Sequence, residues 1–390
     1  MKGAYNETGL YNLAVLKEVK RWCKHHLIEE SQFQKIKETY TSPFYHPNFT
    51  VRILLFVAAL FAISGVTGLF ALFVTSFKED EVFVSIACML YGVASFFFLE
   101  KILIERNHHY KSGVNEALIY HACGFTIGGF MGVFDFNEHA GLFIGVVVLS
   151  FAAVRYLDLV CTVLATLTFA GILFYEFYNL GGIFQHIIPF VFILAFVPVY
   201  VIVKKLKKKN TLKFWFNNLI IVEALSLLFI YAAGNYLVVR ELSIELMDLF
   251  LEEGNDIPFA YIFYALTVLI PIGYLYFGIK HKDIVLLRVS LLVLAFSVFT
   301  FKYYYGFGHP EISLTVAGIV LLVLTILLLN YLKTIRYGFT RENILGEKWA
   351  NVNAEAFIIS QTMGGNQVTT PEQFKGGGGG FGGGGATGSF

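Results

Sequence analysis

The feature that most constrains this chain is a series of long apolar segments that fills most of its 390 residues. The series begins at Arg52 with RILLFVAALFAISGVTGLFALFVTSF and continues to about Lys333, with short charged clusters between the segments. An α-helix needs roughly 20 apolar residues to cross a bilayer. Backbone polar groups in hydrocarbon must bond within their own segment, so the series predicts an all-α bundle that spans the membrane many times.

The composition agrees with this fold class. Hydrophobic residues make up 56% of the chain and charged residues 15%, whereas a soluble domain carries about 25% charged residues. The formal net charge of +1 argues against a nucleic-acid partner, which requires a strongly basic surface. The four cysteines are dispersed, and no His or Cys spacing is typical of metal ligands, so we expect neither a metal site nor a cofactor.

The apolar segments predict ten spans. Their approximate residues are 52–77, 82–104, 114–134, 139–156, 158–179, 183–203, 213–234, 257–279, 283–301 and 312–333. Ten spans place both termini on one side of the membrane. If that side is the cytoplasm, all of the 29 Lys and Arg residues except Lys78, Arg240 and Lys302 lie on it. Lys and Arg are enriched in cytoplasmic loops, so we predict that both termini are cytoplasmic.

The chain divides into four predicted parts. Residues 1–50 form a cytoplasmic amphipathic helical hairpin, because their apolar residues recur every three or four positions. Residues 51–333 form the transmembrane bundle, and residues 334–375 form a cytoplasmic tail. Residues 376–390 are glycine-rich and flexible, since glycine loses much backbone entropy on ordering. Within the bundle, SIELMDLFLEE after the seventh span predicts a short amphipathic helix on the outer surface.

The N-terminal part carries a further pattern. Trp22 is followed by Leu27-Ile28, the acidic pair Glu29-Glu30, Gln32-Phe33 and Ile36, and then by the bundle. This pattern resembles a large family of predicted bacterial multi-spanning membrane proteins of unknown function, in which a hairpin with a Trp and a Gly-Leu-Ile-Ser turn precedes many spans.

Two positions depart from that family: His26 stands where the turn glycine is usual, and Glu29 where the serine is usual. The resemblance implies a multi-pass protein of the bacterial cytoplasmic (inner) membrane and assigns no activity. The glycine-rich tail is similar to tails of otherwise unrelated bacterial membrane proteins, so a cytoplasmic protein that binds this tail or the hairpin is one expected kind of partner, besides membrane lipids.

Ionisable side chains at membrane depth are costly, which makes them candidates for function. The seventh predicted span holds Glu223, preceded by Asn217 and Asn218, and the third holds Glu116 and His121. We predict that these five residues line a polar intramembrane site. Two roles are open for Glu223: a structural glutamate hydrogen-bonded to neighbouring helices, which is favoured, or a site for a proton or a cation.

Two other groups of residues have predicted structural roles. Arg155 and Asp158 lie together at the joint between the fourth and fifth spans, where we expect them to form an ion pair. Gly124, Gly128 and Gly132 repeat every fourth residue of the third span. Small residues at this spacing allow helices to approach closely, either within one chain or between two copies.

Three functions fit the sequence. The first is a carrier of a small solute or a lipid that uses the polar intramembrane site. The second is a membrane sensor or scaffold that acts through the hairpin and the glycine-rich tail. The third is a lipid-modifying membrane enzyme, which ranks last because the chain has no phosphate-binding GxxxxGK[ST] loop and no GxSxG nucleophile motif. We therefore expect no catalytic residues.

Overall fold

The computed structural model describes residues 3–24, 27–74, 76, 81–245 and 256–305, together with isolated residues between 315 and 330. Within these residues the chain is helical apart from turns, loops and one isolated β-bridge between Tyr45 and His109. The predicted tails, 334–375 and 376–390, lie outside the described residues.

Eight helical stretches in this part of the chain are long and apolar enough to cross a membrane. They are α3 (Phe49–Val74), α4 with η2 (Glu81–Phe98 and Leu99–Arg106), α6 (Glu138–Tyr156), α7 (Leu159–Leu180), α8 (Ile183–Leu206), η3 with α9 (Asn210–Trp215 and Phe216–Gly234), α11 (Ala260–Lys280) and α12 (Ile284–Tyr305). The prediction of a multi-pass helical membrane protein is confirmed at this level. The orientation in the membrane stays a prediction.

The other two predicted spans have different outcomes. The third corresponds to α5 (Val114–Val133), which is long enough to cross but less apolar, because Asn115, Glu116 and His121 lower its hydropathy. The tenth, 312–333, lies mostly outside the described residues. The predicted outer helix differs in position: α10 (Tyr236–Glu245) begins seven residues before SIELMDLFLEE, and the residues after Glu245 are not described.

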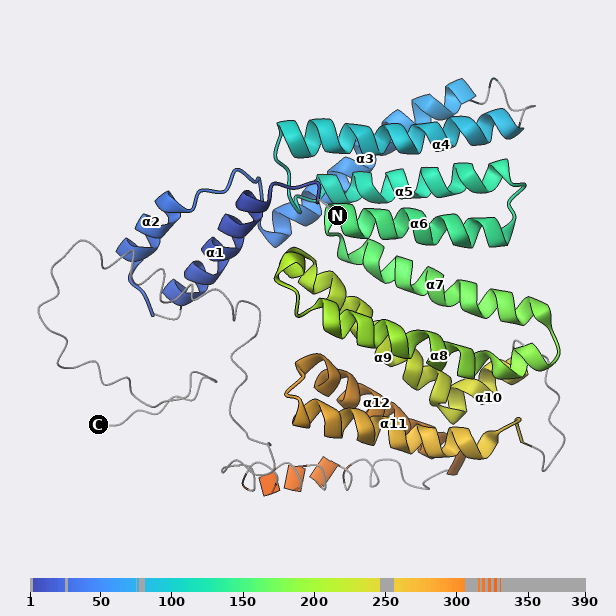
Figure 1. Cartoon of the computed structure of the whole chain (residues 1–390). Coiled ribbons are helices and arrows are strands. Elements are labelled where there is room, and N and C mark those ends of the chain that lie inside the picture. The colour runs from blue at the N-terminus through green and yellow to red at the C-terminus, as the bar shows by residue number, and fades with distance from the viewer. Residues whose placement is uncertain are drawn as a thin grey trace, which may run out of the picture.

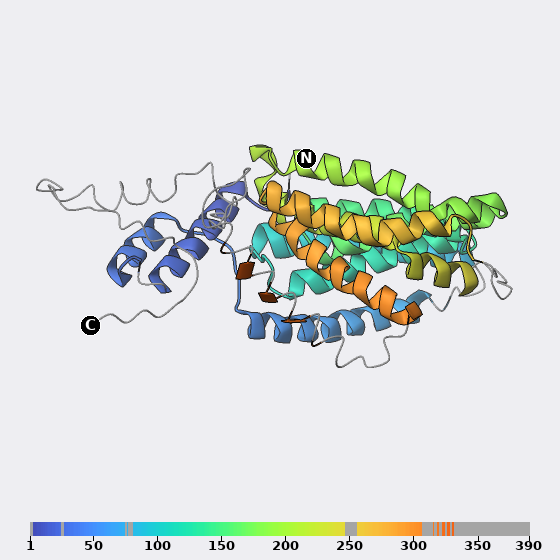
Figure 2. The same ribbon diagram turned by 90° about the horizontal axis from the view of Figure 1, so that it is seen from below.

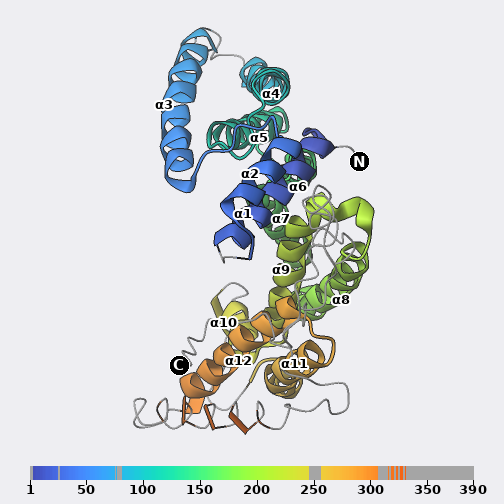
Figure 3. The same ribbon diagram turned by 90° about the vertical axis from the view of Figure 1, so that its left-hand side faces the viewer.

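The helices follow one another in a curved row (Figures 1 and 3). α3 to α7 form one group, in which α4, α5, α6 and α7 lie side by side in chain order and α3 lies against α5. α8 to α12 form a second group around α9, which touches α8, α10, α11 and α12. α8 and α9 also touch α7, so these two helices join the two groups.

α1 (Glu7–Lys24) and α2 (Glu30–Thr39) pack on each other through Val15, Val19 and Ile36. Figures 1 and 2 show the pair beyond one end of the bundle, beside the points where α3 and α5 begin and α6 and α8 end. We call this the α1–α2 end. At the opposite, or far, end α7 leads into α8 and α9 leads into α10.

Close packing joins α4 to α5. A Cβ atom added to Gly129 would collide with the Met89 backbone of α4, and one added to Gly132 would collide with the Ser85 side chain. Gly124 and Gly128 instead have no neighbouring atom within 4 Å. Of the three predicted glycines, only Gly132 lies in the contact between α4 and α5. The second glycine of this contact is Gly129, which the four-residue spacing did not include.

This arrangement allows a matched test on two adjacent glycines. Gly129→Ala is expected to destabilise the bundle by roughly 1–3 kcal/mol, because an over-packed contact forces the backbones apart. Gly128→Ala adds a methyl group in open space and is expected to leave stability unchanged, or to raise it by up to about 1 kcal/mol through helix propensity. Thermal unfolding of the purified protein in detergent measures both. Equal effects of the two substitutions would contradict the assigned contact.

Candidate functional site

The C-terminus of α6 is a junction of distant segments. Leu157 ends the helix in a left-handed conformation (φ 56°), and the last carbonyl groups of a helix lack partners within it. Three of these groups are bound from elsewhere: Ala153 O by the Asn218 amide (3.3 Å), Val154 O by the Trp215 indole N–H (2.8 Å) and Arg155 O by the Ala4 N–H (2.9 Å). We call this junction the α6 corner.

Asp158 and Asn218 complete the α6 corner. Asp158 caps α7 by accepting a hydrogen bond from the Cys161 N–H (2.7 Å), and Tyr120 donates its hydroxyl to the second carboxylate oxygen (3.3 Å). The buried Asn218 amide also contacts Asp158 O (3.0 Å) and Thr162 Oγ1 (2.6 Å). Asn218 therefore ties α9 to the joint between α6 and α7, which is a structural role.

The predicted ion pair between Arg155 and Asp158 is replaced by another. Arg155 makes a bidentate pair with Glu100 of η2, with Nε–Oε1 and Nη2–Oε2 distances of 2.8 and 2.9 Å, and Tyr156 donates to the same carboxylate (3.1 Å). The physical reason is local, since capping holds the Asp158 side chain against the start of α7 while Arg155 extends from α6 toward η2. Bidentate Arg–carboxylate pairs are among the stronger charge-assisted contacts.

Glu116 also has a structural environment. Its side chain is buried, bonds to Arg52 of α3, and accepts the Gly113 N–H (2.7 Å) at the start of its own helix. Gly113 has a φ of +94°, a conformation that glycine adopts without strain. The carboxylate thus caps α5 and neutralises Arg52.

His121 lies elsewhere on α5, among aromatic rings. Its ring centroid is 5.2 Å from that of Tyr91 and 4.6 Å from that of Phe125. The His121 Nε2 atom is buried and has no hydrogen-bond partner among the described residues.

Glu223 is 0% exposed and pairs with Lys207, which follows α8, at an Nζ–Oε2 distance of 2.6 Å. The other carboxylate oxygen has no hydrogen-bond partner in the described part of the chain. Beside this pair, Lys204 contacts Asp283 (3.4 Å) and the Tyr200 hydroxyl (3.1 Å). The end of α8 is therefore held to α9 and to the turn between α11 and α12.

The five residues of the predicted polar site are not brought together. Asn218 belongs to the α6 corner, Glu116 pairs with Arg52, His121 lies among aromatic rings, and Glu223 pairs with Lys207. Asn217 is exposed, because adjacent positions on a helix point in different directions. Within the described residues no cluster of three or more His, Cys, Asp or Glu side chains could hold a metal ion.

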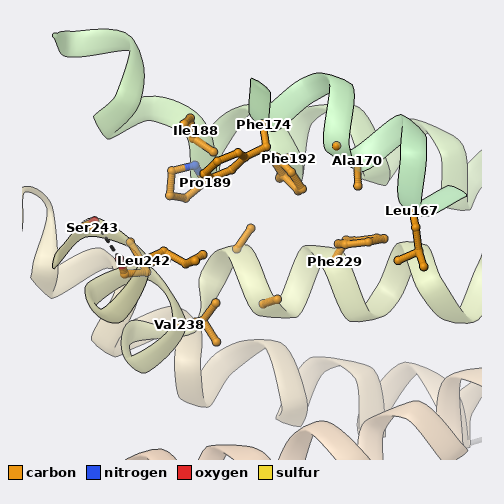
Figure 4. A pocket seen from close by; sticks show the side chains of 14 residues that line it. Leu167, Ala170, Phe174, Ile188, Pro189, Phe192, Phe229, Val238, Leu242 and Ser243 are labelled. Atoms are coloured by element: carbon orange, nitrogen blue, oxygen red, sulfur yellow. Dashed lines mark hydrogen bonds between the residues drawn. The ribbon is translucent and has the colours of Figure 1, made fainter. Parts of the chain in front are cut away.

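A cavity of about 410 Å³ lies at the far end, between α7, α8, α9 and α10. Figure 4 shows Phe174, Pro189 and Phe192 on one wall and Phe229 and Leu242 on the other. Among the described residues that line it, Ser243 alone has a polar side chain, and its hydroxyl donates to Val239 O (2.7 Å).

Local sequence explains the space. Small residues occupy the wall at 170–171 and 232–233, and α9 breaks at Asn235, whose side-chain oxygen accepts the Val238 N–H (3.2 Å) to start α10. Sequence reasoning missed this cavity. The available signals were Pro189 inside a span and the small residues just before Asn235.

Titratable side chains also surround Tyr5, which precedes α1 and packs against the turn between η2 and α5. The Tyr5 hydroxyl accepts a hydrogen bond from the Asn115 amide (3.2 Å), and burial raises the pKa of Tyr5 well above its usual value. Burial also raises the pKa of Tyr110 to about 12 and lowers the pKa of Lys111. Both tyrosines are therefore neutral at physiological pH, as suits their packing against each other.

Comparison with protein-family models, curated proteins and solved structures finds no match to this chain. The N-terminal resemblance stays a prediction.

The Lys207–Glu223 pair predicts an asymmetric response to substitution. Lys207→Met leaves the Glu223 charge buried without a partner and is expected to destabilise the protein by roughly 3–5 kcal/mol. Lys208→Met is the matched control, because Lys208 is exposed and is expected to change stability little. Adding Glu223→Leu to Lys207→Met should recover most of the loss, as measured by thermal unfolding in detergent. Equal loss from the two lysine substitutions would contradict the assignment.

Proposed function

We propose that this protein is a membrane carrier for a lipid or another largely apolar molecule, and that the cavity between α7, α8, α9 and α10 is its binding site. The cavity is the observation that carries the proposal. Ligand sites are clefts or cavities with volumes of about 300–1,000 Å³. This cavity is partly open, since Leu167 and Leu242 of its lining are 45% and 38% exposed, and its volume falls within that range.

The lining supports an apolar substrate over an ion or a sugar. A polar or charged group placed in a cavity without hydrogen-bond partners is strongly disfavoured, and the Ser243 hydroxyl is already bonded within α10. A hydrocarbon chain has no such requirement. The position of the cavity also supports an apolar substrate, because the cavity lies in the far-end half of the membrane-spanning helices, toward the level where lipid chains meet their headgroups.

Two features of the walls support movement around a bound molecule. Pro189 lies in the lining of α8, where it lacks an N–H and interrupts the hydrogen-bond ladder of the helix. Across the cavity, α9 and α10 are separate helices with Asn235 between them. The opposite end of the α8–α9 pair is held by Lys207 and Glu223, so the far end is the part of the pair with the freedom to open.

Filling the cavity tests this function. Ala233→Phe is expected to occupy the space and to reduce labelling by a photoactivatable phospholipid analogue at least severalfold. Ala265→Phe is the control, because Ala265 is exposed on α11, away from the cavity. Labelling sites would be mapped by mass spectrometry of the full-length protein in lipid nanodiscs. Unchanged labelling of Phe174 and Phe192 in Ala233→Phe would overturn the proposal.

A second function, as a sensor or scaffold, is favoured by how α1 and α2 are attached. Ala4 is bonded to the α6 corner, and Tyr45 is bonded to the turn before α5, where its N–H donates to His108 O (3.0 Å) and its carbonyl accepts the Tyr110 N–H (3.2 Å). A partner bound to α1–α2 would thus act directly on α5, α6 and α7. Substitutions of exposed residues on α2 that abolish activity in cells, while Ala233→Phe preserves it, would favour this function over the carrier.

A further inference from the structure

The segment that joins α8 to η3 is the most basic part of the described chain. Residues 204–213 read KKLKKKNTLK, with six lysines and no acidic residue. Two of the six are neutralised, Lys204 by Asp283 and Lys207 by Glu223. The other four are exposed and form no ion pair with the described residues; they are Lys205, Lys208, Lys209 and Lys213.

The backbone of this segment is held in place. Its N–H groups bond within a series of tight turns, from Lys207 to Val203 O (2.9 Å) and from Leu212 to Lys209 O (3.0 Å). Trp215, two residues after the segment, is bonded to the α6 corner through its indole N–H, and the two ion pairs fix the beginning of the segment. The four exposed lysines are therefore presented on an ordered scaffold, so binding a ligand there orders little additional chain.

Their position matches the level of lipid headgroups. α8 has 24 residues and a length of about 36 Å at 1.5 Å per residue, which exceeds the roughly 30 Å of the hydrocarbon core. Lys204 and Lys205 lie in its last turn, so the segment begins where the helix leaves the hydrocarbon. Lys213 lies over the rings of Tyr11 and Phe214, at 5.1 and 5.0 Å. Tyr and Trp are the aromatic residues enriched at membrane interfaces, and Tyr11 and the adjacent Trp215 are of these types.

We propose that residues 205–213 form a binding site for the phosphate headgroup of an anionic phospholipid. Lysine clusters next to the end of a membrane helix attract anionic headgroups through charge. The segment adds a fixed geometry to that attraction, and the two carboxylates that contact it, Asp283 and Glu223, are paired with Lys204 and Lys207. This site lies at the α1–α2 end, whereas the cavity lies at the far end, so the proposal does not depend on the carrier function.

Binding would be tested with the full-length protein in a neutral detergent. Dioleoyl phosphatidylglycerol and dioleoyl phosphatidylcholine, which share their acyl chains and differ in headgroup charge, would be titrated and bound lipid counted by native mass spectrometry. We expect tighter binding of phosphatidylglycerol. The triple variant Lys205→Gln, Lys208→Gln and Lys209→Gln should lower that affinity at least about tenfold and leave phosphatidylcholine unaffected.

The control triple variant removes the same charge elsewhere. Lys24→Gln, Lys35→Gln and Lys37→Gln change exposed residues of α1 and α2 and should retain phosphatidylglycerol binding. Replacing Lys205, Lys208 and Lys209 by Arg should also retain it, which separates loss of charge from a folding defect. Equal affinity of the wild type for both lipids, or equal losses in the two Gln variants, would overturn the site. Competition by inorganic phosphate at equal concentration would assign the ligand to a free anion and overturn the lipid assignment.

Discussion

The arrangement of this bundle depends on how the carbonyl groups at the end of α6 are satisfied. A backbone group left without a hydrogen-bond partner in a membrane is costly. Because α6 ends at Leu157, no further helical turn supplies N–H groups to its last carbonyl groups. The covering groups come from Ala4, Trp215 and Asn218. One helix end therefore fixes the N-terminal segment, the start of α9 and the end of the lysine-rich segment at once. Both α7 and α9 begin at this corner and line the cavity further along their lengths, so the corner fixes the start of two of its walls.

At the α1–α2 end the ion pairs that involve the most buried carboxylates join different helices or the turns between them. Arg52 binds Glu116, Arg155 binds Glu100, and Lys207 binds Glu223. In a medium of low dielectric constant an unpaired charge is far more costly than a paired one, so ionisable residues within spans need not mark a transport path. The far end of α8 and α9 has the opposite character, with aromatic and aliphatic side chains around a space that they do not fill.

The sequence was sufficient for eight of the ten predicted spans and insufficient for the contacts between them. Hydropathy located eight spans because length and apolarity are local properties, and α5 was recognised as a helix despite its polar residues. Burial of Glu223 and Glu116 was also foreseeable, since both lie within apolar segments. Their partners were not, because Lys207 is 16 positions from Glu223 and Arg52 is 64 positions from Glu116. The glycine contact shows the same limit: Gly128 and Gly129 are neighbours in sequence, but packing alone decides which of them faces α4. A cavity leaves still less signal, because it arises where side chains fail to meet.

The two proposals give different roles to the two ends of the α8–α9 pair: lipid-headgroup binding at one end and substrate binding at the other. A carrier needs one part that stays fixed in the membrane and another that opens around its substrate. Lys207, Glu223 and the α6 corner restrain one end, and headgroups bound to residues 205–213 would hold that end at a constant depth. At the other end Pro189 weakens α8, Asn235 separates α9 from α10, and apolar side chains can slide without breaking a hydrogen bond. Under the two proposals, the same pair of helices would combine an anchored end with a deformable binding site, as a carrier that admits an apolar molecule from the side requires.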